Sequence, residues 1–266
     1  YPSKGADLLI LGDLPQGTGL SSSAALELAV ARAACGLGAW LWNPVAMARL
    51  CQKAENEFIG VNCGIMDQFA VAVCEPFSAL FLDCRSLAYR SIPISFKDAE
   101  FMVVNSCVKR ELKSSHYNQR RQECALALQR LRSADPRLAS LRDADLAALD
   151  RAGEPQAVWH RRARHVLTEN ARVLAAVTAL EAGDADAFGR LMTGSHASLR
   201  YDYEVSCMEL DVLVEAALDV EGVLGSRLTG AGFGGCTISL VENSSQEKFK
   251  EHVSAVYKKR TGVSPQ

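Results

Sequence analysis

The sequence lacks the features that mark membrane proteins and nucleic-acid-binding proteins. Its longest stretch without a charged side chain, residues 33–48, contains two glycines and a proline and is too short to cross a bilayer. We find no signal-peptide pattern. Lys and Arg total 29 against 31 Asp and Glu, so no large net charge would attract nucleic acid or an anionic membrane. We therefore predict no nucleic-acid partner and no membrane partner.

Cysteine and histidine are present without the spacing of a metal site or a disulfide framework. The nine cysteines are an odd number, are spread along the chain and form no C-x-x-C pair. They predict reduced, mostly buried thiols and a cytoplasmic location. His160 and His165 lie in the basic run 159–165 (WHRRARH), for which we predict a solvated helix face rather than a metal site. The basic run 109–132 has few aromatic residues, so we predict solvated helix faces there too.

The periodicity of the chain predicts an α+β fold. Strand-like runs occur at 6–13, 79–83, 88–94, 100–105 and 236–241, and helical spacing occurs at 44–58, 118–132, 157–181, 185–198 and 208–218. Strands and helices do not alternate regularly, which argues against a doubly wound sheet. Since 266 residues leave room for two medium domains, we place a boundary near residues 95–100.

The segment GTGLSSSAALELA, residues 17–29, joins the first predicted strand to a predicted helix whose apolar stripe is Leu26, Ala29, Val30 and Ala33. A helix N-terminus presents unpaired N–H groups and the positive end of its dipole, so small residues there let a phosphate approach the backbone. The segment therefore predicts a nucleotide-phosphate site. The alternative is a serine N-cap on an ordinary core helix.

Two common nucleotide-binding patterns are absent around this segment. There is no GK[ST], which excludes a P-loop NTPase, and no G-x-G-x-x-G follows the first predicted strand. A second glycine-rich stretch lies near the other end of the chain, at 225–235, where we predict a loop, and Asp67 is the single charge in the apolar segment 61–73. A nucleotide could be held from two domains if the two glycine-rich stretches meet.

Six motifs in order along the chain resemble the galactokinase family of the GHMP sugar and metabolite kinases. They are PQGTGLSSSAA (15–25), AENEFIGVNCGIMDQF (54–69), LDCRSL (82–87), YNQRRQEC (117–124), GSHASLRYDYEVSCMELD (194–211) and GSRLTGAGFGGC (225–236). The resemblance implies a two-domain GHMP kinase fold with the active site in the cleft between the domains. Residues 1–97 are implied to form an N-terminal mixed-sheet domain (ribosomal protein S5 domain 2-like) and residues 98–266 a C-terminal α/β sandwich domain.

The resemblance also assigns residues to ATP and Mg²⁺. The implied nucleotide-binding residues are Gly17, Thr18, Gly19, Leu20, Ser21, Ser22, Ser23, Gly230 and Gly232. Ser23 and Glu55 are the implied Mg²⁺ ligands, and this ion suits hard oxygen donors and takes only one or two protein groups besides the phosphates. For Glu55, a surface salt bridge is the alternative.

The implied catalytic residue is Asp67, which would face the anomeric hydroxyl of the sugar as a base or as an electrostatic partner. The alternative for Asp67 is an N-cap-type acid at a helix start. Gly64, Asp67 and Tyr117 are the implied sugar-binding residues, although Tyr117 could instead pack under its helix. A buried aspartate needs a nearby cation to stay ionised. In the family this cation is an arginine of an R-V-N-x-I-G-E-H-x-D-Y motif, which this sequence does not contain.

The implied activity is ATP- and Mg²⁺-dependent phosphorylation of α-D-galactose at its anomeric hydroxyl, the first committed step of galactose metabolism, by a monomer. Alternatives are a related GHMP sugar kinase, or a non-catalytic paralogue that binds galactose and ATP and regulates a partner. The sequence departs from the family in its missing N-terminal motif, in ending before the last strand, and in Ala231, where glycine is common. We therefore expect the 266 residues alone to bind sugar poorly and to turn over little or not at all.

Overall fold

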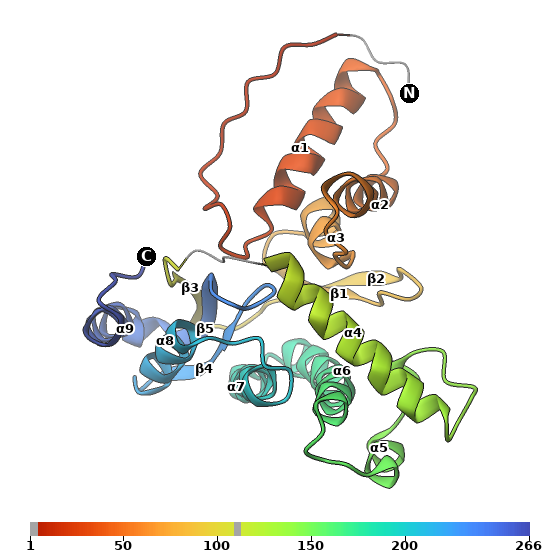
Figure 1. Cartoon of the computed structure of the whole chain (residues 1–266). Helices are drawn as coiled ribbons and strands as arrows, with labels where there is room; N and C mark the ends of the chain where they lie inside the picture. The colour runs from red at the N-terminus through yellow and green to blue at the C-terminus, as the bar shows by residue number, and fades with distance from the viewer. Residues whose placement is uncertain (1–4, 109–112) are drawn as a thin grey trace. The chain divides into compact units, whose positions relative to one another are not determined.

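The computed structural model describes residues 5–108 and 113–266, and it divides the chain into two compact units, Tyr1–Ile94 and Ser95–Gln266. Figure 1 shows the helices and strands of both. Helices and antiparallel strands occur together without a parallel sheet among the described residues, which confirms the α+β class. The family boundary between residues 97 and 98 stays a prediction.

The first unit is mainly helical. Its elements are α1 (Ser22–Leu37), α2 (Pro44–Ala54), a π-helical turn (Glu55–Ile59), α3 (Met66–Val73), β1 (Ser78–Leu82) and β2 (Tyr89–Pro93). The start of α2 is as predicted, because the Asn43 side chain accepts a hydrogen bond from the Ala46 N–H and Pro44 occupies the first turn. The two strands pair antiparallel, and Phe69 of α3 is fully buried beside them.

Two predictions for the first unit are wrong. Residues 6–13 form no strand, and Leu9 and Leu11 in that segment are 86% and 83% exposed. No described strand of this unit pairs with the segment, and a strand needs a partner for its backbone hydrogen bonds. The buried face of α1 is formed by Ala24, Leu28 and Cys35, not by the predicted stripe. In a helix this rich in alanine, the sequence distinguishes the faces poorly.

The second unit contains a three-stranded antiparallel sheet of order β3-β5-β4 with helices around it. Its strands are β3 (Ala99–Asn105), β4 (Val223–Leu228) and β5 (Cys236–Glu242). Its helices are α4 (Lys113–Arg132), α5 (Leu146–Ala152), α6 (Val158–Ala182), α7 (Ala185–Tyr201), α8 (Met208–Leu218) and α9 (Gln246–Thr261), with short 3₁₀ turns at Leu141–Asp143 and Asn243–Ser245.

Each face of this sheet packs against helices. Residues of α8 and α9 form one apolar cluster with Val241 of β5, and Met192 of α7 packs with Leu240 on the other face. The prediction of a loop from residue 225 onward is wrong, because β4 continues to Leu228. A Cβ added to Gly225 would lie 2.0 Å from the Gly189 carbonyl oxygen of α7, so glycine in this strand lets the helix approach closely.

Helices α4, α5 and α6 form a further cluster around Leu149 and Trp159. Within the described residues, no helix is long and apolar enough to cross a membrane. All nine cysteines are free; Cys35, Cys51 and Cys236 are buried, whereas Cys74, Cys84 and Cys107 are exposed. The free cysteines agree with the prediction of reduced thiols. The prediction that most of these thiols are buried is wrong.

Candidate active site

The segment 17–21 is a tight loop that leads directly into α1. Gly17 and Gly19 have φ values of 74° and 88°, a region that favours glycine. Thr18 between them is buried, and its hydroxyl donates a hydrogen bond of 3.0 Å to the Pro15 carbonyl oxygen. Ser21 also has a positive φ of 56° and precedes the first helical residue, Ser22. The glycines and Ser21 together turn the backbone sharply at the helix start.

The serine N-cap alternative for this segment is confirmed in position but not in hydrogen bonding. Ser21 occupies the N-cap position of α1, but its side chain makes no capping hydrogen bond, and the first turn carries no acidic side chain. The N–H groups of a first helical turn have no partner within the helix, and the dipole adds positive potential there. This helix start therefore suits an anion such as a phosphate group.

Glu55 is buried within the first unit, 9% exposed, and the surface salt-bridge alternative is wrong. Its neighbour Glu57 makes that kind of contact instead, with Lys53 at 3.6 Å. Glu55 lies beside Glu27 of α1. The pKa of Glu27 is raised to about 7, first by burial and then by the charge of Glu55 and a hydrogen bond with it, whereas a hydrogen bond from Gln68 opposes the shift. Two carboxyl groups therefore share one partly buried position.

Glu55 forms a cluster with three residues that sequence reasoning missed, Glu27, Cys63 and Gln68. Gln68 is 1% exposed, and its amide nitrogen lies 3.9 Å from the Cys63 sulfur. Burial, followed by the charge of Glu55, raises the pKa of Cys63 to about 11. A signal for Glu27 was available, because it follows Ser23 by four residues and so lies on the same face of the helix.

Glu27 relates the two predicted metal ligands, Ser23 and Glu55, to each other. Ser23 lies one helical turn before Glu27, which in turn hydrogen-bonds Glu55. The Glu27 Oε2 atom is buried without a hydrogen-bond partner. Among the described residues, no group of three His, Cys, Asp or Glu side chains could hold a metal. A hydroxyl and one or two carboxylates nonetheless fit Mg²⁺, which keeps waters and phosphate oxygens in its remaining positions.

Asp67 lies in the first turn of α3, directly before the buried Gln68 of this cluster. It is partly exposed, and the described residues place no ion-pairing cation beside it. Gly64 is exposed, and a Cβ there would meet nothing within 4 Å, so the backbone is open to solvent at this point. The first unit thus carries the loop at 17–21, the carboxyl pair of Glu27 and Glu55, and Asp67 on α1, the π-helical turn and α3 or directly before them.

The second glycine-rich segment, residues 230–235, joins β4 to β5. Gly230 and Gly232 have φ values of 73° and 78°. A Cβ on Gly232 would lie 2.1 Å from the Val205 carbonyl oxygen, so both its conformation and its surroundings require glycine. Ala231 is not among the residues with positive φ, so alanine fits at this departure from the family. We call residues 230–235 the second glycine loop.

Tyr117 lies on α4 of the second unit and is half-buried. It is close to Tyr203, whose pKa is raised by burial first, then by Cys124, and also by the nearby Tyr117. Three residues further along α4, Arg120 is buried, so the prediction of a solvated face fails at that residue. Of the basic residues in that run, Lys109 and Arg110 lie outside the described residues.

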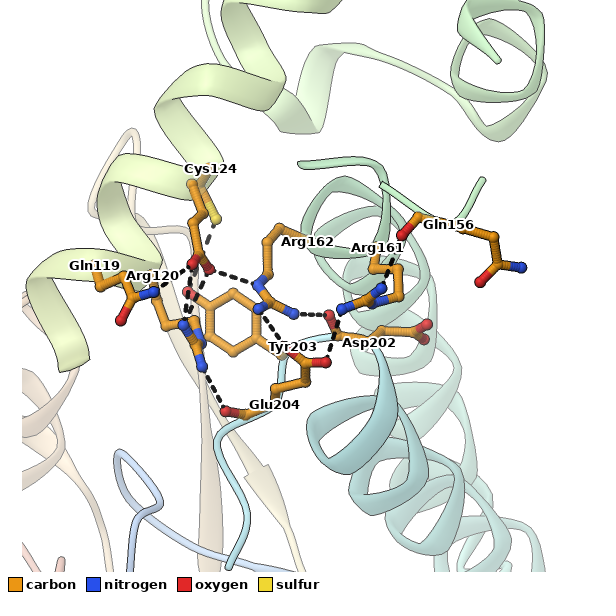
Figure 2. A network of polar contacts seen from close by, with 10 residues as sticks. Gln119, Arg120, Cys124, Gln156, Arg161, Arg162, Asp202, Tyr203 and Glu204 are labelled. Carbon is orange, nitrogen blue, oxygen red and sulfur yellow. Dashed lines mark hydrogen bonds and ion pairs between the residues drawn. The ribbon is translucent and has the colours of Figure 1, made fainter. Parts of the chain in front are cut away.

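The predicted solvated face of run 159–165 is also wrong. His160 and Arg162 are each 1% exposed and His165 is 7% exposed. Arg162 can be buried because its guanidinium group has carboxylate and carbonyl partners on three sides (Figure 2). Spacing within the run predicted a helix, but the partners of Arg162 come from residues far away in the sequence.

Comparison with known proteins identifies the family of this chain. Residues 1–75 match the model of the GHMP kinases N terminal domain, and residues 176–259 match that of the GHMP kinases C terminal. The galactokinase of Roseiflexus sp. (strain RS-1) is 48% identical over 260 residues, covering 97% of this chain and 66% of that protein. The galactokinase of Halalkalibacterium halodurans is 43% identical over 264 residues, covering 98% of this chain and 67% of that protein.

Solved structures show the same relationship. A crystal structure of Lactococcus lactis galactokinase complexed with galactose matches 96% of this chain and 66% of its own, with a TM-score of 0.91 and 39% identity. A homoserine kinase from Cytophaga hutchinsonii shares the fold, with a TM-score of 0.61 at 16% identity. The fold is that of the GHMP kinases. Within them, this chain belongs to the galactokinase family, and it spans about two thirds of the length of the relatives it matches.

Proposed function

We propose that the protein containing these residues transfers the γ-phosphoryl group of ATP to the anomeric hydroxyl of α-D-galactose, giving galactose 1-phosphate and ADP. The observation that carries the proposal is Asp67 in the first turn of α3, directly before Gln68, which hydrogen-bonds Glu27 of the carboxyl pair on α1 and the π-helical turn. The identity of 48% and 43% to galactokinases supports galactose as the sugar.

In this reaction the oxygen at C1 of the sugar loses its proton and bonds to the γ-phosphorus, while the bond from that phosphorus to ADP breaks. Enzymes accelerate such a transfer mainly by positioning the reactants and by stabilising charge in the transition state. The backbone of residues 17–21 and the start of α1 would hold the phosphates. Asp67 would face the attacking hydroxyl, as the acceptor of its proton or as a fixed negative charge.

ATP and Mg²⁺ are part of this proposal. The Ser23 hydroxyl and the Glu55 carboxylate would hold the ion, with Glu27 beside them. When bound, Mg²⁺ neutralises charge on the β- and γ-phosphate oxygens. The residues of this chain would keep the ion close to the helix start, because Ser23 and Glu27 lie on α1 and Glu55 contacts Glu27.

The test uses the complete product of the gene that encodes these residues, with ATP, Mg²⁺ and a panel of sugars. Phosphate transfer is followed by ADP release and by ³¹P NMR of the sugar product. We expect galactose 1-phosphate, with galactose giving the highest kcat/KM. Faster transfer to arabinose, galacturonate or an N-acetylhexosamine would assign the related sugar-kinase alternative. Binding of galactose and ATP without transfer would assign the regulatory alternative.

We further propose a cytosolic monomer as the working form. The nine free cysteines support a reducing compartment. Sedimentation of the same full-length product, with and without dithiothreitol, is expected to give the monomer mass in both cases.

A further inference from the structure

Four charged side chains form a network in the second unit, which we call the arginine network: the buried Arg120 and Arg162, the partly buried Glu123 and the exposed Glu204. Figure 2 labels the two arginines and Glu204. The Arg162 Nε donates to Glu123 Oε2 at 2.7 Å, and its Nη2 donates to Glu204 Oε2 at 2.5 Å. The Arg120 Nη1 also donates to Glu123, at 3.1 Å. The network therefore joins α4 and α6 to the chain that follows α7.

The network holds backbone as well as side chains. The Arg162 Nη1 donates to the Asp202 carbonyl oxygen at 2.6 Å, and the Arg120 Nη2 donates to the Glu204 carbonyl oxygen at 2.8 Å. Glu204 has a φ of 54°, an unfavourable value for a residue with a side chain. Burial alone would raise the pKa of Glu204, but its hydrogen bond and ion pair with Arg162, and then Arg161, lower it. Its carboxylate is therefore stabilised in the charged form that the arginines bind.

The residue after this constrained turn contacts the second glycine loop. The Val205 carbonyl oxygen accepts a hydrogen bond of 2.7 Å from the Phe233 N–H. The same oxygen occupies the space that a side chain on Gly232 would need. The guanidinium carbon of Arg120 lies 5.8 Å from the centre of the Phe233 ring. Phe233 itself has a positive φ of 58°. Two strained residues, Glu204 and Phe233, thus meet at Val205.

We propose that the arginine network positions the second glycine loop for nucleotide binding, with Arg162 as the central positioning residue. Arg162 fixes the turn at Glu204, the turn fixes the Val205 carbonyl, and this carbonyl fixes the backbone at Gly232 and Phe233. The nucleotide part of this inference rests on the proposed function.

The central experiment replaces Arg162 by Lys in the full-length product. Lysine keeps the charge but has a single nitrogen, so it cannot bind Glu123, the Asp202 carbonyl and Glu204 together. We expect faster hydrogen exchange at Phe233 and at residues 203–207, unchanged exchange in β3, and an ATP dissociation constant raised about tenfold. The KM for ATP should rise more than the KM for galactose.

The matched control is Leu149→Ala. Leu149 belongs to the apolar cluster of α4, α5 and α6, so its truncation destabilises the packing of these helices without altering Glu204 or the second glycine loop. It is expected to leave exchange at Phe233 and the affinity for ATP unchanged at temperatures where it is folded. If it weakens ATP binding as much as Arg162→Lys does, the network is only structural and the proposal is wrong. Unchanged exchange at Phe233 in Arg162→Lys would also overturn it.

A second variant covers failure of Arg162→Lys to fold. Glu204→Gly removes the carboxylate partner of Arg161 and Arg162 at a partly exposed position whose φ suits glycine. We expect the same changes in exchange, smaller in size, because the bond from Arg120 to the carbonyl of residue 204 remains. If the wild-type protein binds no ATP, the proposed function and the nucleotide part of this inference fail. Hydrogen exchange then still decides whether the network positions the loop.

Discussion

Glu55 and Glu57 are two glutamates of the same π-helical turn with different environments, and they make a matched pair of variants. Glu55 is buried against Glu27, whereas Glu57 pairs with Lys53 at the surface. We predict that Glu55→Gln weakens Mn²⁺ binding about tenfold or more in the presence of a non-hydrolysable ATP analogue, measured by electron paramagnetic resonance. Glu57→Gln should bind like the wild type. Equal affinities for all three proteins would remove Glu55 from the metal site.

Asp67 is the acid on which the chemistry of the proposed reaction depends. Asp67→Asn keeps the shape of the side chain and removes its charge. We predict that kcat falls by about 10²–10⁴-fold while the dissociation constant for ATP stays the same, measured by ADP release and by calorimetry. The exposed Asp219, at the end of α8, gives the control Asp219→Asn, with unchanged kcat. Full turnover by Asp67→Asn would end the catalytic assignment.

His165 makes the stability of the second unit depend on pH. It is buried, its Nδ1 lies 3.0 Å from the Ser198 hydroxyl, and burial lowers its pKa from 6.5 to about 4, although Glu169 opposes the shift. The unfolded chain takes up a proton on this residue below pH 6.5, whereas the folded protein does so only near pH 4. The free energy of unfolding should therefore fall as the pH drops through this window, by up to about 3 kcal/mol.

The measurement for His165 is urea unfolding between pH 7.5 and pH 4.5, compared with the variant His165→Gln, which can still hydrogen-bond Ser198. The variant should lose stability less steeply over this range. His116→Gln, at an exposed histidine, should follow the wild-type curve. A curve for His165→Gln that is parallel to the wild-type curve would show that other groups cause the pH dependence.

Two of the residues that sequence reasoning placed wrongly, Arg120 and Arg162, are charged residues with distant partners. Helical spacing within one segment predicts that an arginine lies on the solvated face. Considered with its own helix alone, each of Arg120 and Arg162 is therefore predicted to be exposed. Their carboxylate and carbonyl partners include Glu204, which is 84 and 42 residues away in the sequence. Asp67, Glu55 and Ser23 could be named because they lie in motifs, which carry information that periodicity does not.

At the scale of elements, the second glycine loop allows backbone strain to be separated from steric clash. Gly232 and Gly262 have almost the same φ, 78° and 77°, but a Cβ would clash with Val205 at Gly232 and would meet nothing within 4 Å at Gly262. We predict that Gly262→Ala costs about 1 kcal/mol of unfolding free energy and that Gly232→Ala costs about 1–3 kcal/mol more. Chemical denaturation gives both values. Equal costs would mean that the loop can move away from Val205.

The elements that were predicted correctly are those whose pattern is complete within one segment. Helix α2 has its cap, its proline and its period in the sequence, and β3 and β5 are short apolar runs. Strand β4 was missed because Gly225 and the polar residues beside it are typical of loops, whereas the reason for that glycine is the close passage of α7. The strand at 6–13 was predicted from apolar content alone, which cannot supply a pairing partner.

At the scale of the whole molecule, the order of six motifs predicted the family and the fold class, because the motifs together are far more specific than any glycine loop. The sequence predicted a boundary near residues 95–100, and the structure divides the chain into units between Ile94 and Ser95. It could not show which side chains of α4 and α6 meet the turn after α7, since such packing depends on three segments at once. The arginine network therefore became visible only in three dimensions.

Each unit carries one of the two glycine-rich segments assigned to the nucleotide, and this leads to a prediction for the whole molecule. A ligand that binds only the folded state stabilises it by about 2.7 kcal/mol at a free concentration of 100 times its dissociation constant. We predict that ATP with Mg²⁺ at that level raises the thermal unfolding transitions of both units of the full-length product, as seen by scanning calorimetry.

Asp67→Asn should show the same shift, because it alters chemistry rather than binding. Gly232→Ala should show a smaller shift for the unit that contains it, since its loop is displaced while the segment at 17–23 is intact. A shift confined to one unit, in the wild type, would assign the nucleotide to that unit alone and would remove the other glycine-rich segment from the binding site.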